Sequence, residues 1–179
     1  MNNLEHQTLE NNNREDETIE NEDIELNQED THEPFDPTKI RVEPRQMTID
    51  LILTRIKHGE LKLSPDFQRK EVWNDEAKSR LIESILIRIP LPSFYIDATN
   101  EEQWIVIDGL QRLTALKQFI LKPEEKSNYH KNDNQNQLKL IKLDYLKDLE
   151  GTTYDQLPRK YQRRILETQL LLYLIQEGT

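Results

Sequence analysis

Residues 103–121 contain the feature that most constrains the fold, a buried-strand pattern that leads directly into an amphipathic helix. Residues 104–107 are uninterruptedly apolar, and apolar side chains then recur at helical spacing over 110–121. Only Asp108 and Gly109 stand between the two patterns, and a glycine takes the positive backbone angle of a tight turn without steric cost. The chain must therefore bury a strand and one face of a helix that a single tight turn joins.

The predicted helix start is suited to an anionic ligand. Peptide N–H groups in a first helical turn have no intrahelical partner, and they lie at the positive end of the helix dipole. Arg112 adds a planar fork of donors that suits a phosphate, while Asp108 can accept from a water, a hydroxyl or a metal-bound water. A helix cap or turn-stabilising carboxylate is an equally frequent role for Asp108. We predict a phosphate-binding corner with Asp108, Gln111 and Arg112 at the junction.

A second Gln-Arg pair, Gln68–Arg69, follows Phe67 in a similar setting. Two arginines that converge on one pocket can clamp a polyphosphate, since each bidentate contact is charge-assisted and directional. Taken alone, Arg69 is more often a surface residue that packs its stem along an aromatic neighbour.

Acidic residues are concentrated at the N-terminus. Residues 1–33 hold twelve acids against one base, Arg14, and no aromatic residue, so their charge of −11 exceeds the chain's net charge of −10 and leaves about +1 for residues 34–179. Such a segment cannot bury enough surface to offset its ordering entropy. We predict a disordered acidic tail over 1–33, an extended lead-in over 34–45 and a globular domain over 46–179. A tail that mimics nucleic acid or shields a basic surface is the less frequent alternative.

Several classes of site are excluded by composition. The chain has no cysteine, its four histidines have no metal-ligand spacing, and it contains neither a nucleophile elbow nor a P-loop. We therefore predict no metal site and find no nuclease motif. No apolar run reaches transmembrane length and the N-terminus is not a signal peptide, so we expect a cytoplasmic protein without a membrane partner.

Local signals place the other elements of the domain. Thr48 and Asn74 are expected N-caps of two helices, the first closed by Gly59 and the second with an apolar stripe that continues to Ile89. The remaining pattern predicts a short strand at 61–63, a hairpin from 93–97 and 103–107, an exposed insertion at 123–137, a strand near 138–143, a turn at Gly151 and a basic helix over 158–167.

Two late segments keep alternative interpretations. The Leu-rich run 169–175 suits either a helix or a strand, and as a strand inside a sheet it requires a further neighbour. The basic cluster Arg159, Lys160, Arg163 and Arg164 can contact nucleic-acid phosphates, although a solvated helix face is the more frequent role.

Three motifs in order resemble the N-terminal domain of GmrSD and SspE type proteins, in the ParB/sulfiredoxin-like superfamily. They are Pro65-x-Phe67-Gln68-Arg69-x-x-Val72-Trp73, Ser84-Ile85-Leu86-x-x-Ile89-Pro90-Leu91-Pro92 and Ile107-Asp108-Gly109-x-Gln111-Arg112-Leu113-Thr114-Ala115-Leu116. The resemblance runs from about residue 46 to 175 and implies an α+β, ParB/sulfiredoxin-like domain, with a small mixed sheet flanked by helices.

The resemblance also implies a function. Such domains bind a nucleoside triphosphate, in several members hydrolyse it, and control a nuclease in defence against phage with modified DNA. Its Asp-Gly-Gln-Gln-Arg signature corresponds to Asp108, Gly109, Leu110, Gln111 and Arg112, so Leu110 departs from it. Arg88 stands where a glycine is common. The nuclease domain or subunit is expected to be supplied elsewhere, and self-association is left open.

Two function classes follow from these observations. In the first, the domain is a nucleotide-dependent switch or weak triphosphatase, and the base of its nucleotide is left open. The expected catalytic residues, Asp108 and Gln111, order a water or a magnesium shell. The expected nucleotide-binding residues are Gln68, Arg69, Asp108, Gly109, Gln111 and Arg112. In the second, it is a ParB-like module that binds DNA or protein without turnover, against which the nearly neutral charge of the globular part argues. We favour the first, and we expect Arg112→Ala to abolish nucleotide-induced stabilisation while leaving the fold intact.

Overall fold

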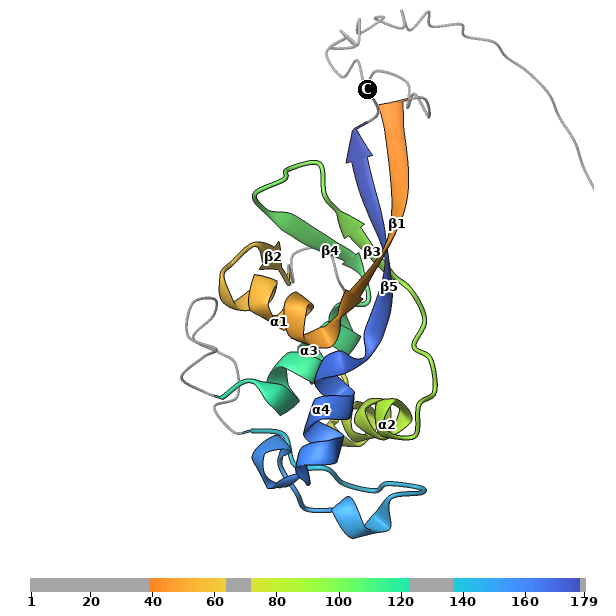
Figure 1. Ribbon diagram of the computed structural model, residues 1–179, viewed down its shortest axis with the longest axis vertical. Coiled ribbons are helices and arrows are strands. Elements are labelled where there is room, and N and C mark those ends of the chain that lie inside the picture. Colours follow the sequence, from red (N-terminus) through yellow and green to blue (C-terminus); the bar gives the residue numbers. More distant parts are fainter. Residues whose placement is uncertain (1–38, 64–71, 123–136, 178–179) are drawn as a thin grey trace, which may run out of the picture. The chain divides into compact units, whose positions relative to one another are not determined.

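The computed structural model describes residues 39–63, 72–122 and 137–177. They form an α+β fold, as expected, in which a five-stranded mixed sheet is combined with helices (Figure 1). The elements in chain order are β1 (Ile40–Thr48), α1 (Ile49–Lys57), β2 (Leu61–Lys62), α2 (Asp75–Leu86), β3 (Phe94–Asp97), β4 (Trp104–Asp108), α3 (Leu110–Ile120), the 3-10 turns η3 (Lys147–Leu149) and η4 (Tyr154–Gln156), α4 (Arg159–Glu167) and β5 (Gln169–Glu177).

The Leu-rich run is a strand, β5, and it lies inside the sheet. The strand order is β1-β5-β3-β4-β2, with β5 antiparallel to β1 and parallel to β3. The predicted hairpin of β3 and β4 is confirmed, and β4 also pairs in parallel with the short strand β2. The neighbour that β5 requires is β1, which forms from residues of the extended lead-in. Pro44 is tolerated in β1 because that strand is at the edge of the sheet.

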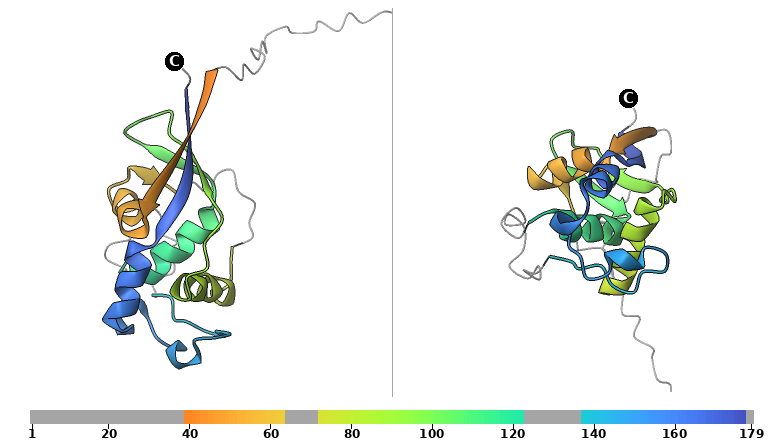
Figure 2. Two further views of the ribbon diagram at one scale, coloured as in Figure 1. Left: turned by 45° about the vertical axis from the view of Figure 1, so that its right-hand side comes forward. Right: turned by 60° about the horizontal axis from the view of Figure 1, so that its bottom comes forward.

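The two faces of the sheet have different surroundings. Side chains that alternate along β3, β4 and β5 are buried in one hydrophobic core with the helices, among them Phe94, Ile96, Val106 and Leu172. Figure 2 shows the helices gathered on that side, at the lower end of the β1–β5 ribbon. Residues between them in sequence point the other way, and two of these, Tyr95 and Tyr173, stack with ring centroids 5.3 Å apart.

The helix starts agree with the expected caps. Thr48 Oγ1 accepts from the Leu51 N–H at 3.3 Å, and Asn74 Oδ1 accepts from the Ala77 N–H at 2.9 Å. Helix α3 differs from α1 and α2, because its N-cap is Gly109 and no side chain caps it. The first turns of α1 and α2 thus have a side-chain acceptor that the first turn of α3 lacks.

The strand predicted near 138–143 is wrong. Leu138, Leu140 and Leu143 are buried, but the segment follows an irregular path in which Lys142 has a positive φ of 49°. Its amides bond to several different segments: Leu138 and Leu140 N–H donate to the backbone carbonyls of Gln118 and Thr152, and Ile141 N–H donates to Ser79 Oγ at 3.0 Å. Alternating burial arises here without strand pairing, because these scattered carbonyl and side-chain partners do not belong to one neighbouring strand.

The helical stripe predicted to reach Ile89 ends earlier. Helix α2 stops at Leu86, and Arg88 takes a positive φ of 67° that redirects the chain. Ile89 is consequently 51% exposed instead of buried.

Two predicted segments, the acidic tail at 1–33 and nearly all of the insertion at 123–137, lie outside the described residues. Within the described part of the chain, no helix is long and apolar enough to cross a membrane.

Candidate functional site

The corner between β4 and α3 has the tight turn expected from the sequence. Asp108 ends β4, and Gly109 follows with a φ of 97° before α3 begins. The turn also packs closely on the ring of Phe94 in β3, because a Cβ added to Gly109 would lie only 2.3 Å from Cδ1 of that ring. A glycine is therefore required here for two reasons, the backbone angle and the close approach.

Arg112 is held from several sides. Its Nη1 donates to the Pro92 carbonyl, and its Nη2 donates to the Ser93 carbonyl at 3.2 Å and to Asp108 Oδ2 at 2.9 Å. The guanidinium carbon also lies 4.3 Å from the ring centroid of Phe94, a cation–π arrangement. With its side chain only 13% exposed, Arg112 fixes the segment that enters β3 to the start of α3.

These contacts give Arg112 a structural role beside its predicted binding role, so Arg112→Ala is expected to keep the fold at a reduced stability. We expect this substitution to lower the free energy of unfolding by about 2 kcal/mol, because it removes three hydrogen bonds and exposes a gap beside Phe94. Urea unfolding of the variant measures the loss. Arg41→Ala, which removes a largely exposed arginine from β1, is the control and should change stability little. Equal stability of the two variants would show that the guanidinium does not hold the β3 entry.

Gln111 connects the same corner to a third segment. Its Oε1 accepts from the backbone N–H of Trp73 at 3.2 Å, across 38 positions of sequence. Trp73 ends the first of the three motifs, Pro92 ends the second, and Asp108 to Arg112 belong to the third. All three motifs therefore meet at the first turn of α3. Gln68 and Arg69, in the first motif, lie outside the described residues.

The chemistry of the corner follows from which groups face solvent. The Asp108 side chain is 62% exposed, so its carboxylate lies on the solvent side of the nearly buried guanidinium. Leu110, the departure from the family signature, is buried in the core. The corner thus combines uncapped first-turn amides with an arginine whose one anionic partner is at the surface, an arrangement that can accept an anion.

The sequence did not reveal the groups that position Arg112, namely the Phe94 ring and the carbonyls of Pro92 and Ser93. The only available signal was the second motif, which ends at Pro92. Among the described residues, no three His, Asp or Glu side chains are grouped so that they could hold a metal ion. Two open pockets lined by described residues lie elsewhere, one between α2 and α4 and one beside α1.

The fold and the corner together define an α+β domain with an anion-accepting strand-to-helix turn as its candidate site. The family model described as GmrSD restriction endonuclease, N-terminal domain, matches residues 49–178, and the chain belongs to this family. Searches of the curated proteins and of the solved structures gave no match. The ParB/sulfiredoxin-like relationship stays a prediction from the sequence.

Proposed function

We propose that this domain binds a nucleoside triphosphate at the β4–α3 corner and, as a weak triphosphatase, regulates a nuclease of a restriction system that acts against phage. The nuclease is a separate domain or subunit. The family supports the restriction role, since it consists of N-terminal domains of GmrSD restriction endonucleases. Binding and hydrolysis of a nucleotide are the more specific part of the proposal.

The observation that carries the nucleotide proposal is the convergence of three motifs on one uncapped helix start. Gln111 accepts from the Trp73 N–H, and Arg112 donates to the carbonyls of Pro92, which ends the second motif, and of Ser93, which follows it. Arg69, the proposed second arginine, precedes Trp73 by four residues in the sequence. A preorganised guanidinium beside first-turn amides suits a phosphate, because positioning and charge neutralisation are what phosphoryl transfer needs most.

Asp108 has two roles in this proposal. Without ligand its exposed carboxylate accepts from the nearly buried guanidinium of Arg112, and solvent around the carboxylate limits the loss on breaking this ion pair to about 1 kcal/mol. With a triphosphate, that carboxylate is free to join a magnesium shell, since Mg²⁺ is commonly bound by one or two carboxylates together with phosphates and waters. A magnesium ion held there would supply charge neutralisation on the phosphates, and Gln111 and Asp108 would orient the attacking water.

Thermal unfolding of the full chain with each of the four nucleoside triphosphates and magnesium tests the proposal. At about 100 times its dissociation constant, a bound nucleotide should add roughly 2.7 kcal/mol of stability. Asp108→Asn should melt like the wild type without ligand, because Asp108 is exposed, but should lose the magnesium-dependent part of the stabilisation.

Asp148→Asn, which changes an exposed aspartate in η3, is the matched control and should respond to nucleotide like the wild type. No stabilisation by any of the four nucleotides at millimolar concentration would remove the proposal. Stabilisation by duplex DNA alone would instead favour the ParB-like binding module.

A further inference from the structure

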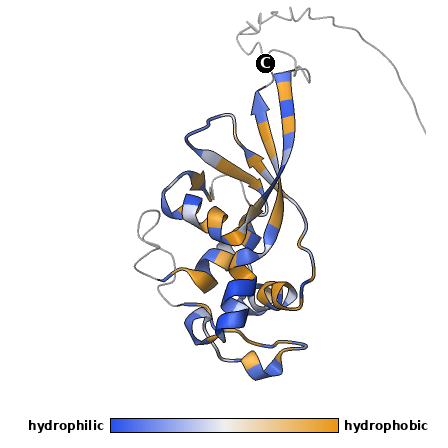
Figure 3. Cartoon of the chain, in the orientation of Figure 1, coloured by the Kyte–Doolittle hydropathy of each residue, from blue (hydrophilic) through white to orange (hydrophobic). Residues whose placement is uncertain are grey.

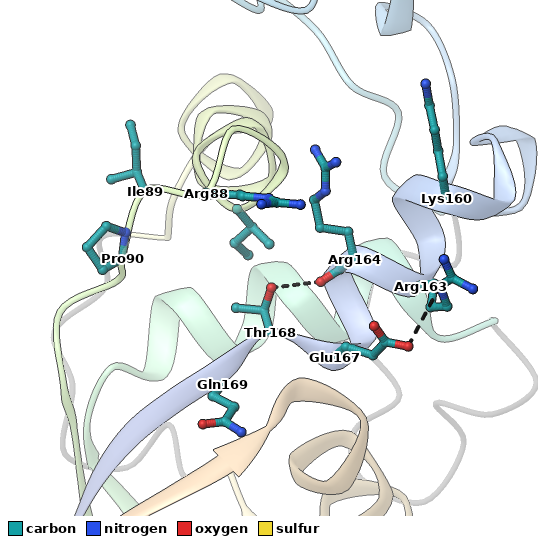
Figure 4. A pocket seen from close by; sticks show the side chains of 10 residues that line it. Arg88, Ile89, Pro90, Lys160, Arg163, Arg164, Glu167, Thr168 and Gln169 are labelled. Carbon is teal, nitrogen blue, oxygen red and sulfur yellow. Dashed lines mark hydrogen bonds and ion pairs between the residues drawn. The ribbon is translucent and has the colours of Figure 1, made fainter.

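The pocket between α2 and α4 gathers positive charge and shares no lining residue with the β4–α3 corner. It has a volume of about 440 Å³ and is formed by the end of α2, the loop after it, one side of α4 and the start of β5 (Figure 4). Its lining includes four cationic side chains, Arg88, Lys160, Arg163 and Arg164, and Glu167 is the only acidic residue among the lining residues. Figure 3 shows α4 as largely hydrophilic.

Arg88 is the most informative of the four. Its side chain has no hydrogen-bond or ion-pair partner among the described residues, and Figure 4 shows its guanidinium directed toward Arg164 across the pocket. Its φ of 67° is a left-handed angle that L side chains rarely adopt outside Asn, Asp and Gly. A strained backbone that places an unpaired cation opposite another cation indicates a binding role, because neither feature stabilises the fold by itself.

The other cations are placed by α4. Arg164 Nη1 donates to the Leu86 carbonyl at 2.7 Å, which fixes the guanidinium at the end of α2. Lys160 lies 4.8 Å from the ring centroid of Tyr161, and Arg163 has only a long ion pair with Glu167, at 3.8 Å. Lys160 and Arg163 thus line the same pocket from α4, at a distance from the facing pair Arg88 and Arg164.

We propose that this pocket binds a phosphate group, with Arg88 and Arg164 on two sides of it and with Lys160 and Arg163 beside it. A phosphate between two guanidinium groups removes their mutual repulsion and accepts charge-assisted, bidentate hydrogen bonds. The phosphate belongs either to a nucleic-acid backbone or to a free oligophosphate, since both present the same anion. A merely solvated basic face on α4, the alternative considered from the sequence, does not explain Arg88, because Arg88 follows α2 and is not part of that helix.

Binding of two probes to the full chain tests the proposal, pyrophosphate by calorimetry and a labelled 12-base-pair duplex by fluorescence anisotropy. Arg88→Gly removes the cation and also suits the positive φ, so the variant should fold at least as well as the wild type. It should weaken binding about tenfold, as expected for loss of a charge-assisted contact. Nucleotide-induced stabilisation at the β4–α3 corner should be unchanged, which separates this site from the other.

Lys142→Gly is the matched control, because Lys142 is also an exposed cation at a positive φ, 49°, and its side chain pairs with Glu76 at the surface. It should leave both affinities within about twofold of the wild type. If Arg88→Gly weakens binding of the duplex alone, the pocket is assigned to a nucleic-acid backbone. If it weakens binding of pyrophosphate alone, the pocket is assigned to a free oligophosphate. Equal effects of the two variants, or no binding of either probe, would overturn the proposal.

Discussion

Gly109→Ala should lower the free energy of unfolding by about 3 kcal/mol or more, through two effects that act together. The residue has a φ of 97°, and strain of this kind costs about 1–3 kcal/mol for an L side chain. The added methyl group would also lie 2.3 Å from a Phe94 ring carbon, so the ring or the turn must move, and overpacking of this kind costs about 1–3 kcal/mol. Chemical denaturation of the variant measures the total loss of stability from backbone strain and overpacking.

Gly151→Ala separates the two effects. Gly151 has a similar positive φ of 80°, but nothing lies within 4 Å of an added Cβ, so this variant has the backbone strain without the clash. We expect it to lose only about 1 kcal/mol. Equal losses in the two variants would show that the Gly109 turn does not need its close approach to Phe94.

The same contact explains why the site and the fold are difficult to separate at this corner. The Phe94 ring packs beneath Gly109 on one side and against the Arg112 guanidinium on the other. A change at any of the three positions therefore alters both stability and the position of the arginine. Asp108, which is exposed, is the better residue for testing ligand binding without changing the fold.

Elements with local signals were predictable from the sequence. Thr48 and Asn74 cap helices because an N-cap depends on residues three positions apart, and the Asp108–Gly109 turn needs only a glycine between two periodic patterns. The Leu-rich run 169–175 was ambiguous between helix and strand because its structure does not depend on a local signal. Its identity as β5 depends on pairing with β1, whose Pro44 and alternating charges are not a local strand signal.

The details of the sites depend on contacts between residues distant in sequence. Arg112 was singled out correctly as a residue of the corner, but its carbonyl partners lie about twenty positions earlier and carry no side-chain signal. The pocket between α2 and α4 could not be predicted either, because Arg88 acquires its place only where α2 ends and the backbone turns.

Glu83 illustrates the same dependence on distant partners and gives the second large prediction. This side chain of α2 is 3% exposed and accepts the backbone N–H groups of Asp144 at 2.9 Å, Tyr145 at 2.7 Å and Leu146 at 2.8 Å. Glu83→Ala should lower the free energy of unfolding by about 4 kcal/mol, because three amides lose at once the acceptor that the buried carboxylate supplies. Urea unfolding at neutral pH measures the loss.

The pH dependence of the stability distinguishes the contribution of the Glu83 charge from that of a neutral side chain of the same shape. Burial raises the pKa of this carboxyl, but the hydrogen bonds from Leu146, Asp144 and Tyr145 lower it by more, so the folded pKa lies below the ordinary value of 4.5. Its contribution is thus fully present above pH 4.5 and is lost as the pH falls through the folded pKa. In Glu83→Gln this part of the acid destabilisation should be absent, whereas Glu102→Gln, a change at an exposed glutamate, should follow the wild-type profile. If Glu83→Gln kept the wild-type slope below pH 4.5, then the acid sensitivity would come from other carboxylates and the buried charge would not hold the 144–146 segment in place.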